Sequence, residues 1–159
     1  SHFRNGTLLK DLNQYWFSQH PIQQLVIELT ERDALLDVDY RVVRELNRLG
    51  VKLAIDDFGT GNSSLSWLEK LRPDVLKIDK SFIGAIGVDS VNATVTDMNI
   101  ALAHRLKIVM VAEGVETQEQ EAYLRDNGVD LLQGYYYARP MPVEDFPQWL
   151  AAEKRREMR

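Results

Sequence analysis

Strand-like and helix-like patterns of hydrophobic residues alternate along this chain. Short runs rich in Val, Ile and Leu are typical of buried parallel strands, and one begins about every 23 to 32 residues. Five strands are predicted, at residues 25–29, 51–55, 75–79, 107–112 and 129–134. Apolar residues at helical spacing predict helices at residues 7–17, 37–49, 65–71, 91–106, 117–127 and 143–158. The alternation predicts parallel strands joined by crossover helices.

Glycine and proline mark the ends of several of these elements. Gly50 and Gly128 follow two predicted helices, and Pro73 stops the short helix before the third strand. Residues 56–64, which are rich in Gly, Ser and Asn, are predicted to form a loop. The apolar faces of residues 91–106 and 143–150, the latter including Trp149, are interpreted as parts of the core.

Two architectures bury both faces of a parallel sheet, an open doubly wound sheet and a (β/α) barrel. Length favours the open sheet, because a complete barrel needs about 250 residues and this chain has 159. The polar residues favour the barrel, because all five strands have polar ends and an open sheet concentrates its site at one switch point. These ends are Glu28 to Glu31, Asp56 with Asp57, Lys77 with Asp79, Glu113 with Glu116, and Gln133. We predict an α/β fold, a partial (β/α) barrel of the TIM type with about five βα units, in one domain over residues 1–159.

Composition excludes several classes of function. A net charge of -5 argues against a nucleic-acid surface, and the basic run at 154–156 with Arg159 is interpreted as a solvated helix end. The chain has no apolar run near 18 residues and no signal-like start, so we expect a cytoplasmic segment without membrane contact. The absence of cysteine excludes disulfides and thiolate metal sites.

The segment from Asp56 to Gly61 carries the most specific chemical signal. Adjacent carboxylates at the end of an apolar strand repel one another, so Asp56 and Asp57 are expected to need a metal ion or a basic partner. Gly59 and Gly61 give the following residues conformational freedom, which would let this segment fold over a ligand.

Lys77 is the expected basic partner of this acidic pair. It lies within a buried strand, two residues before Asp79 and on the same face, where an unpaired ammonium would be costly. It either forms a structural ion pair or orients or deprotonates a nucleophile. Glu28 and Thr30 share one strand face, and Glu31 is expected to enter the loop beyond.

The available ligand types favour hard divalent cations. Oxygen ligands without cysteine or paired histidines favour Mg²⁺ or Mn²⁺, and two such ions can promote phosphodiester cleavage. His2, His20 and His104 do not lie at strand ends and are interpreted as lying outside the site. The run Tyr135 to Tyr137 fits either base stacking or aromatic packing in a strand.

Taken in order, five segments resemble the EAL-domain phosphodiesterases, which hydrolyse cyclic di-GMP in bacteria. The segments are Glu28-Leu29-Thr30-Glu31, Asp56-Asp57-Phe58-Gly59-Thr60-Gly61, Lys77-Ile78-Asp79, Glu113-Gly114-Val115-Glu116 and Gln133-Gly134. The resemblance covers about residues 1 to 150. It implies a modified (β/α) barrel that opens cyclic di-GMP to linear pGpG with two Mg²⁺ or Mn²⁺ ions.

The resemblance also implies a role for each matching residue. Glu28 would bind the first metal ion, Asp56 would bridge both ions, and Asp57 and Glu113 would lie at the second. Lys77 would contact the attacking water, Asp79 would support it, and Gln133 would line the far side of the substrate site. Supporting residues outside the metal site would be Glu31, Glu116, Gly59 and Thr60, with Glu31 holding the loop over residues 57–64.

The chain departs from the family pattern in two places. No Glu-Ala-Leu occurs in it, so that strand would precede residue 1 together with two ligands of the first metal ion. We therefore expect the carboxyl-terminal portion of one EAL domain, inactive by itself, whose unpaired strand edges would favour a homodimer or strand exchange. Asn62 stands where the family often has an aromatic residue, which concerns the loop rather than metal binding.

Two other interpretations remain open at this point. A degenerate EAL module would bind cyclic di-GMP or a protein partner without turnover, although retention of Lys77, Asp56 and Asp57 argues against decay. A phosphoacceptor receiver domain also combines an acidic pair, an aspartate and a lysine on an open sheet. In receivers the pair is on the first strand and the lysine follows the fifth, whereas here they are on the second and third.

Overall fold

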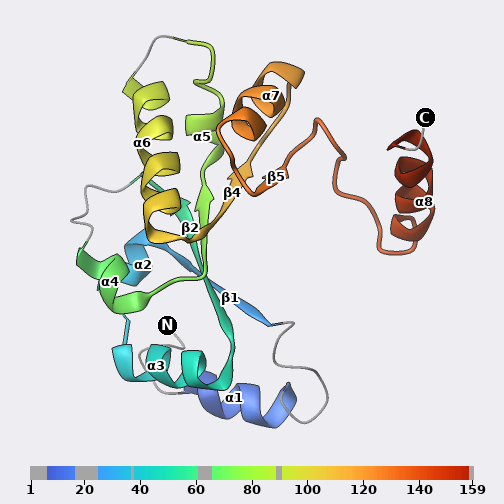
Figure 1. The fold of residues 1–159 in the computed structure, drawn as a ribbon. Coiled ribbons are helices and arrows are strands. Elements are labelled where there is room, and N and C mark those ends of the chain that lie inside the picture. The colour runs from blue at the N-terminus through green and yellow to red at the C-terminus, as the bar shows by residue number, and fades with distance from the viewer. Residues whose placement is uncertain (1–6, 17–24, 37, 61–65, 89–90, 158–159) are drawn as a thin grey trace.

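A computed structural model describes residues 7–16, 25–36, 38–60, 66–88 and 91–157. The strands are β1 (Val26–Thr30), β2 (Lys52–Phe58), β3 (Val75–Ile78), β4 (Val109–Glu113) and β5 (Leu131–Gln133). The helices are α1 (Thr7–Tyr15), α2 (Glu31–Leu36), α3 (Tyr40–Leu49), α4 (Ser66–Leu71), α5 (Lys80–Ile83), α6 (Val91–Leu106), α7 (Gln118–Asp126) and α8 (Phe146–Glu157). Figure 1 shows this alternation of strands and helices along the chain.

The five strands form one parallel sheet in the order β1-β2-β3-β4-β5. Each strand therefore lies beside the strand that follows it in the sequence, as in a (β/α) barrel. A doubly wound sheet reverses direction at a switch point, and this sheet does not. The predicted partial barrel is confirmed, and the strand order argues against a receiver domain. Among the described residues, β1 and β5 each pair on one side only.

The two faces of the sheet differ in burial. Alternate strand residues such as Ile55, Leu76 and Met110 are fully buried in a core shared with α3, α4, α5, α6 and α7. The strand residues that alternate with these point to the other face, and among them Val26, Val109 and Leu131 are 40 to 57% exposed. Since successive side chains point to opposite faces, the covering helices bury one face and leave the other open.

Two helices have well-defined caps at one end. Gly50 ends α3 in the left-handed conformation, with φ at +82°, as its position after the predicted helix indicated. The Thr117 side chain accepts a hydrogen bond from the Gln120 backbone at the start of α7, and the Gln120 side chain closes the reciprocal capping box.

The prediction that residues 56–64 form a loop is wrong at its start. Strand β2 continues to Phe58, which is buried and pairs with Ile78 of β3. The register shifts between Ile55 and Phe58, so β2 contains a bulge around Asp56 and Asp57. Burial of Phe58 accounts for the extra strand residues. Residues 61–64, including Asn62, lie outside the described residues.

Two short helices at strand ends were not predicted. Glu31 was expected in a loop, yet it begins α2 and is 4% exposed. Asp79 caps α5 by accepting a hydrogen bond of 2.9 Å from the Ser81 backbone. Both helices are too short for a periodic apolar pattern to reveal them.

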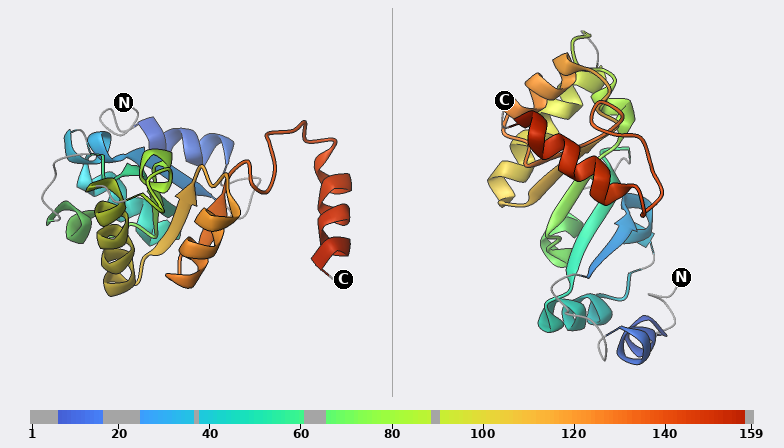
Figure 2. Two further views of the ribbon diagram at one scale, coloured as in Figure 1. Left: turned by 90° about the horizontal axis from the view of Figure 1, so that it is seen from above. Right: turned by 90° about the vertical axis from the view of Figure 1, so that its right-hand side faces the viewer.

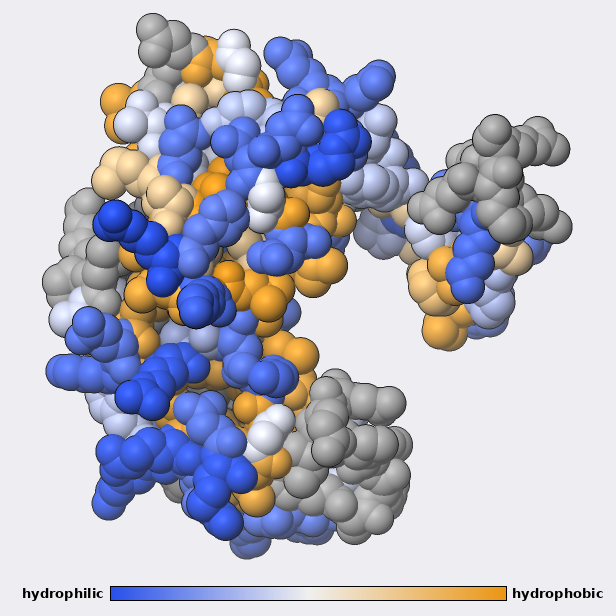
Figure 3. Space-filling view, viewed as in Figure 1, coloured by the Kyte–Doolittle hydropathy of each residue, from blue (hydrophilic) through white to orange (hydrophobic). Residues whose placement is uncertain are grey.

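Helix α8 does not join the core, contrary to the interpretation of residues 143–150. It lies apart from the sheet and its helices (Figures 1 and 2), and no residue from 146 to 154 is buried. The rings of Phe146 and Trp149 stack on each other at 5.9 Å, and hydrophobic residues of α8 appear at the surface in Figure 3. None of the helices in the described segments is long and apolar enough to cross a membrane.

A hydrogen bond between helices should make stability depend on alkaline pH. The Tyr123 hydroxyl of α7 donates to the Asp97 carboxylate of α6, and this bond, with burial and the Asp97 charge, raises the pKa of Tyr123 to about 12. Its contribution to stability is present below pH 10 and lost as pH rises through about 12. Tyr123→Phe should lower stability at neutral pH and reduce the loss between pH 10 and 12, measured by urea unfolding at successive pH values. An equal alkaline loss in both proteins would contradict this.

Candidate active site at the carboxyl edge of the sheet

Four strands bring one lysine and three carboxylates together. The Lys77 ammonium of β3 lies 3.1 Å from Glu28 Oε2, 3.1 Å from Asp56 Oδ1 and 2.9 Å from Glu113 Oε1. Glu28 is on β1, Asp56 on β2 and Glu113 on β4. We call Glu28, Asp56, Lys77 and Glu113 the acidic cluster. The sequence predicted this convergence at the carboxyl edge, and the structure places all four together.

Parallel register explains why these side chains meet. Glu28 pairs with Ala54 two residues before Asp56, and Lys77 pairs with Val111 two residues before Glu113. All four cluster residues therefore share the open face of the sheet, because residues two apart on a strand point the same way. Their strands end at the same edge, so the polar groups gather beyond the apolar part of that face.

Lys77 keeps its proton in this setting. Burial alone would lower the pKa of the ammonium, since it disfavours the charged form. Hydrogen bonds from the ammonium to Glu113, Asp56 and Glu28 outweigh that effect and raise the pKa of Lys77 well above its ordinary value. The lysine side chain is only 13% exposed. It is therefore a charged donor rather than a base at neutral pH.

Asp57 lies beside the acidic cluster in a strained backbone conformation. Its φ is +55°, which is unusual for a residue other than glycine. Burial raises the pKa of Asp57, and the charges of Asp56 and Asp79 raise it further while Lys77 lowers it. The expected partnership of Lys77 with the acidic pair thus takes the form of an ion pair with Asp56, with Asp57 acting through its charge.

Glu31 connects α2 to the segment after Asp57. Its Oε2 atom accepts a hydrogen bond of 3.0 Å from the Gly59 amide. The Thr60 hydroxyl donates to the Asp57 carbonyl at 2.8 Å. Glu31, Gly59 and Thr60 therefore hold the backbone next to the acidic pair, as far as the described residues extend.

Asp79, Glu116 and Gln133 surround a neighbouring cavity of about 260 Å³, which Glu113 and Tyr135 also line. Hydrogen bonds from Ser81 lower the pKa of Asp79, although burial opposes them. The Asp79 carboxylate also caps α5 by accepting from the Ser81 amide. The cavity adjoins the acidic cluster through Glu113.

Sequence reasoning did not single out Lys80, which also lines this cavity. Its position directly after Asp79, at a strand end, was the available signal. The run Tyr135 to Tyr137 forms a turn, so its expected place in a strand is wrong, although the Tyr136 and Tyr137 rings do pack edge to face at 5.2 Å. Arg139 lies 4.5 Å from the Tyr135 ring centroid.

His104 binds the Gly128 carbonyl away from the site, and His2 and His20 lie outside the described residues.

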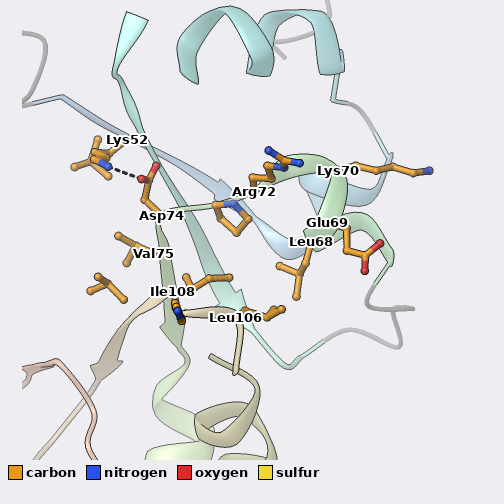
Figure 4. Close-up of a pocket in the computed structure, with 13 residues that line it drawn as sticks. Lys52, Leu68, Glu69, Lys70, Arg72, Asp74, Val75, Leu106 and Ile108 are labelled. Carbon is orange, nitrogen blue, oxygen red and sulfur yellow. Dashed lines mark hydrogen bonds and ion pairs between the residues drawn. The ribbon is translucent and has the colours of Figure 1, made fainter. Parts of the chain in front are cut away.

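A larger hollow of about 1020 Å³ lies at the opposite, amino-terminal edge of the strands. Lys52, Lys70 and Arg72 line it together with apolar residues. Figure 4 shows Lys52 turned to Asp74 on one side while Lys70 extends away on the other. Lys52 is therefore already paired with Asp74, and this hollow lies at the opposite edge of the sheet from the acidic cluster.

The donor atoms of the candidate site fit hard divalent cations. Within the described segments, no three acidic or histidine side chains are already arranged as a metal-binding group, and the Lys77 ammonium lies among the carboxylates. Glu28, Asp56, Asp57 and Glu113 nevertheless offer carboxylate oxygens, which are the ligands that Mg²⁺ and Mn²⁺ prefer.

Comparison with known proteins gives consistent matches. A sequence model of the EAL domain matches residues 1–140. The chain is 74% identical over 154 residues to the "Probable cyclic di-GMP phosphodiesterase PdeD" of Escherichia coli K12, covering 97% of this chain and 29% of that protein.

Two solved structures are similar in fold and sequence. The PaMucR phosphodiesterase in complex with c-di-GMP has a TM-score of 0.85 and 36% identity, covering 91% of this chain and 60% of that chain. Klebsiella pneumoniae BlrP1 in a manganese and cyclic di-GMP complex has a TM-score of 0.72 and 34% identity, covering 85% and 34%. The chain spans less than two thirds of each relative.

Proposed function

The chain belongs to the EAL family, and from this premise we propose that its acidic cluster takes part in hydrolysing cyclic di-GMP to linear pGpG with divalent cations. The observation that carries the proposal is the convergence of Glu28, Asp56 and Glu113 on Lys77 within 3.1 Å. Relatives named as cyclic di-GMP phosphodiesterases support the choice of substrate.

The proposed metal ligands are Glu28, Asp56, Asp57 and Glu113. A manganese complex of a similar structure supports a divalent ion, and we propose Mg²⁺ or Mn²⁺ from the oxygen donors. Two bound ions would supply positive charge near the attacking and leaving oxygens of the phosphodiester. Carboxylates that now bind Lys77 would then share their charge with the ions.

Lys77 is proposed to orient the attacking water as a hydrogen-bond donor. An ammonium has three hydrogens to donate, which suits this role better than proton abstraction, the other role that the sequence left open. The ammonium also reduces repulsion between carboxylates from three strands. Asp79 would contribute negative charge beside Asp57.

Gln133 and Glu116 are proposed to line the substrate site on the side away from the metal ligands. Both line the cavity that adjoins Glu113. An amide can both donate and accept hydrogen bonds, which suits contact with a guanine edge or a ribose hydroxyl. Glu31, Gly59 and Thr60 would keep Asp57 in place through the contacts described above.

Cleavage of cyclic di-GMP provides the direct test. The reaction with Mn²⁺ is followed by chromatography of pGpG for this chain and for a longer chain that includes a Glu-Ala-Leu strand. We expect turnover by the longer chain and its loss in Asp56→Asn, because Asp56 is the proposed bridging ligand.

The control is Asp74→Asn, which alters an aspartate that binds Lys52 and the Leu53 amide at the opposite edge. This variant should retain turnover. Binding of cyclic di-GMP without product would instead favour a degenerate module that binds nucleotide without turnover. If the longer chain neither binds nor cleaves cyclic di-GMP, the proposal is wrong.

A further inference from the structure

Asn99 is a buried polar residue that the chemistry above does not use. It lies on α6 and is 8% exposed, and its Nδ2 atom has no hydrogen-bond partner among the described residues. A buried unpaired donor costs about 1–3 kcal/mol. Such exceptions are few in folded proteins and concentrate at functional sites. The surroundings of this amide therefore need an explanation.

The Asn99 amide packs directly against Gly59. A β-carbon at Gly59 would lie 2.5 Å from Asn99 Nδ2 and 3.2 Å from the Phe82 ring. Gly59 has φ at +96°, a conformation that other residues adopt only with strain. Glycine is thus required here both by the backbone and by the space that Asn99 occupies.

Gly59 is held from two sides. Glu31 of α2 accepts its amide hydrogen at 3.0 Å, and Asn99 of α6 fills the space beside its α-carbon. Asp57 lies only two residues earlier, with its own φ at +55°. A left-handed conformation costs a non-glycine residue about 1–2 kcal/mol. It persists only where neighbouring contacts enforce it.

We propose that Asn99 is a positioning residue, whose buried amide packs against Gly59 and thereby keeps Asp57 in the conformation that sets its carboxylate beside the acidic cluster. The two residues come from elements far apart in the sequence, β2 and α6. Asn99 contributes no charge, so it can restrain this backbone without changing the electrostatic balance among Asp56, Asp57 and Lys77.

A matched pair of α6 variants tests the proposal in the longer chain defined above. Asn99→Ala removes the amide beside Gly59. Thr96→Ala is the control, because Thr96 is fully buried one turn earlier and its hydroxyl bonds to the Phe82 and Asn92 carbonyls. Both variants lose a buried polar side chain of α6, but only the first loses the contact with Gly59.

Two measurements separate positioning from general stability. Hydrogen exchange of the Gly59 amide, followed by NMR, should accelerate about tenfold in Asn99→Ala and much less in Thr96→Ala. Affinity for Mn²⁺, measured from the electron paramagnetic resonance signal of free Mn²⁺, should fall about tenfold in Asn99→Ala alone.

The Mn²⁺ measurement rests on the proposed function, whereas the exchange measurement does not. Unchanged Gly59 exchange, or equal acceleration in both variants, would overturn the positioning role. The proposal would also be overturned if Gly59 exchange accelerated only in Asn99→Ala but the Mn²⁺ affinity of that variant were unchanged. Asp57 would then be insensitive to the position of Gly59. If the unsubstituted chain binds no Mn²⁺ but Gly59 exchange still accelerates only in Asn99→Ala, the result would support the restraint of Gly59 by Asn99 and count against the proposed metal site.

Discussion

Replacing Lys77 with methionine is expected to reduce the rate of cyclic di-GMP cleavage by about 1,000-fold in the longer chain. Methionine keeps the length of the side chain but removes the ammonium that binds Glu28, Asp56 and Glu113. The three carboxylates would then repel one another, and the attacking water would lose its proposed donor. Initial rates of pGpG formation at saturating Mn²⁺ measure the effect.

Lys52→Met is the matched control for this prediction. Lys52 is also a β-sheet lysine with a carboxylate partner, but it binds Asp74 at the opposite edge of the sheet. Its loss should leave the rate unchanged, because an exposed ion pair contributes at most about 1 kcal/mol to stability and is remote from the cluster. Similar rates for Lys77→Met and the parent chain would show that Lys77 has no part in the reaction.

Substituting alanine for Gly134 should destabilise the fold by at least about 3 kcal/mol. A β-carbon there would overlap the carbonyl oxygen and the amide nitrogen of Val115. These backbone atoms cannot move easily, because Val115 N donates to the Gln133 carbonyl and the Val115 carbonyl accepts from Tyr136 N. The variant would force the turn after β5 away from the end of β4, next to Glu113. Urea unfolding followed by circular dichroism measures the loss.

Gly84→Ala provides a comparison at a permissive glycine. A β-carbon at Gly84 would lie 3.4 Å from the Lys80 carbonyl oxygen, at the limit of ordinary contact. Gly84 has an ordinary right-handed helical conformation, with φ at -63°. Stability should therefore change by less than about 1 kcal/mol. If both variants unfold at the same urea concentration, the close approach between Gly134 and Val115 is not a constraint.

The Gln133-Gly134 pair illustrates how the structure adds meaning to a weak motif. Two residues after an apolar run say little by themselves. Gln133 ends β5 opposite Glu113, and Gly134 allows the backbone of the next turn to pack against Val115. The importance of Gly134 arises from a contact between the segments that follow β4 and β5, which the local sequence does not report.

The pattern of apolar strands with polar ends determined the parallel sheet and most of the candidate site. Buried strands need continuous apolar runs, and charged residues at their ends are tolerated only where they pair, so Glu28, Asp56, Lys77 and Glu113 could be identified along the chain. The resemblance to a family added the expected substrate and ions.

Tertiary structure alone decided how the segment after Asp57 is held and which groups neutralise one another. The bulge in β2, the burial of Glu31 and the contact of Asn99 with Gly59 depend on packing between α2, β2 and α6. Lys77 forms its ion pair with Asp56, whereas Asp57, with φ at +55°, interacts with Lys77 through its charge alone. Such choices depend on distances between distant segments, whereas hydrophobic periodicity records only which side of its own element each residue occupies.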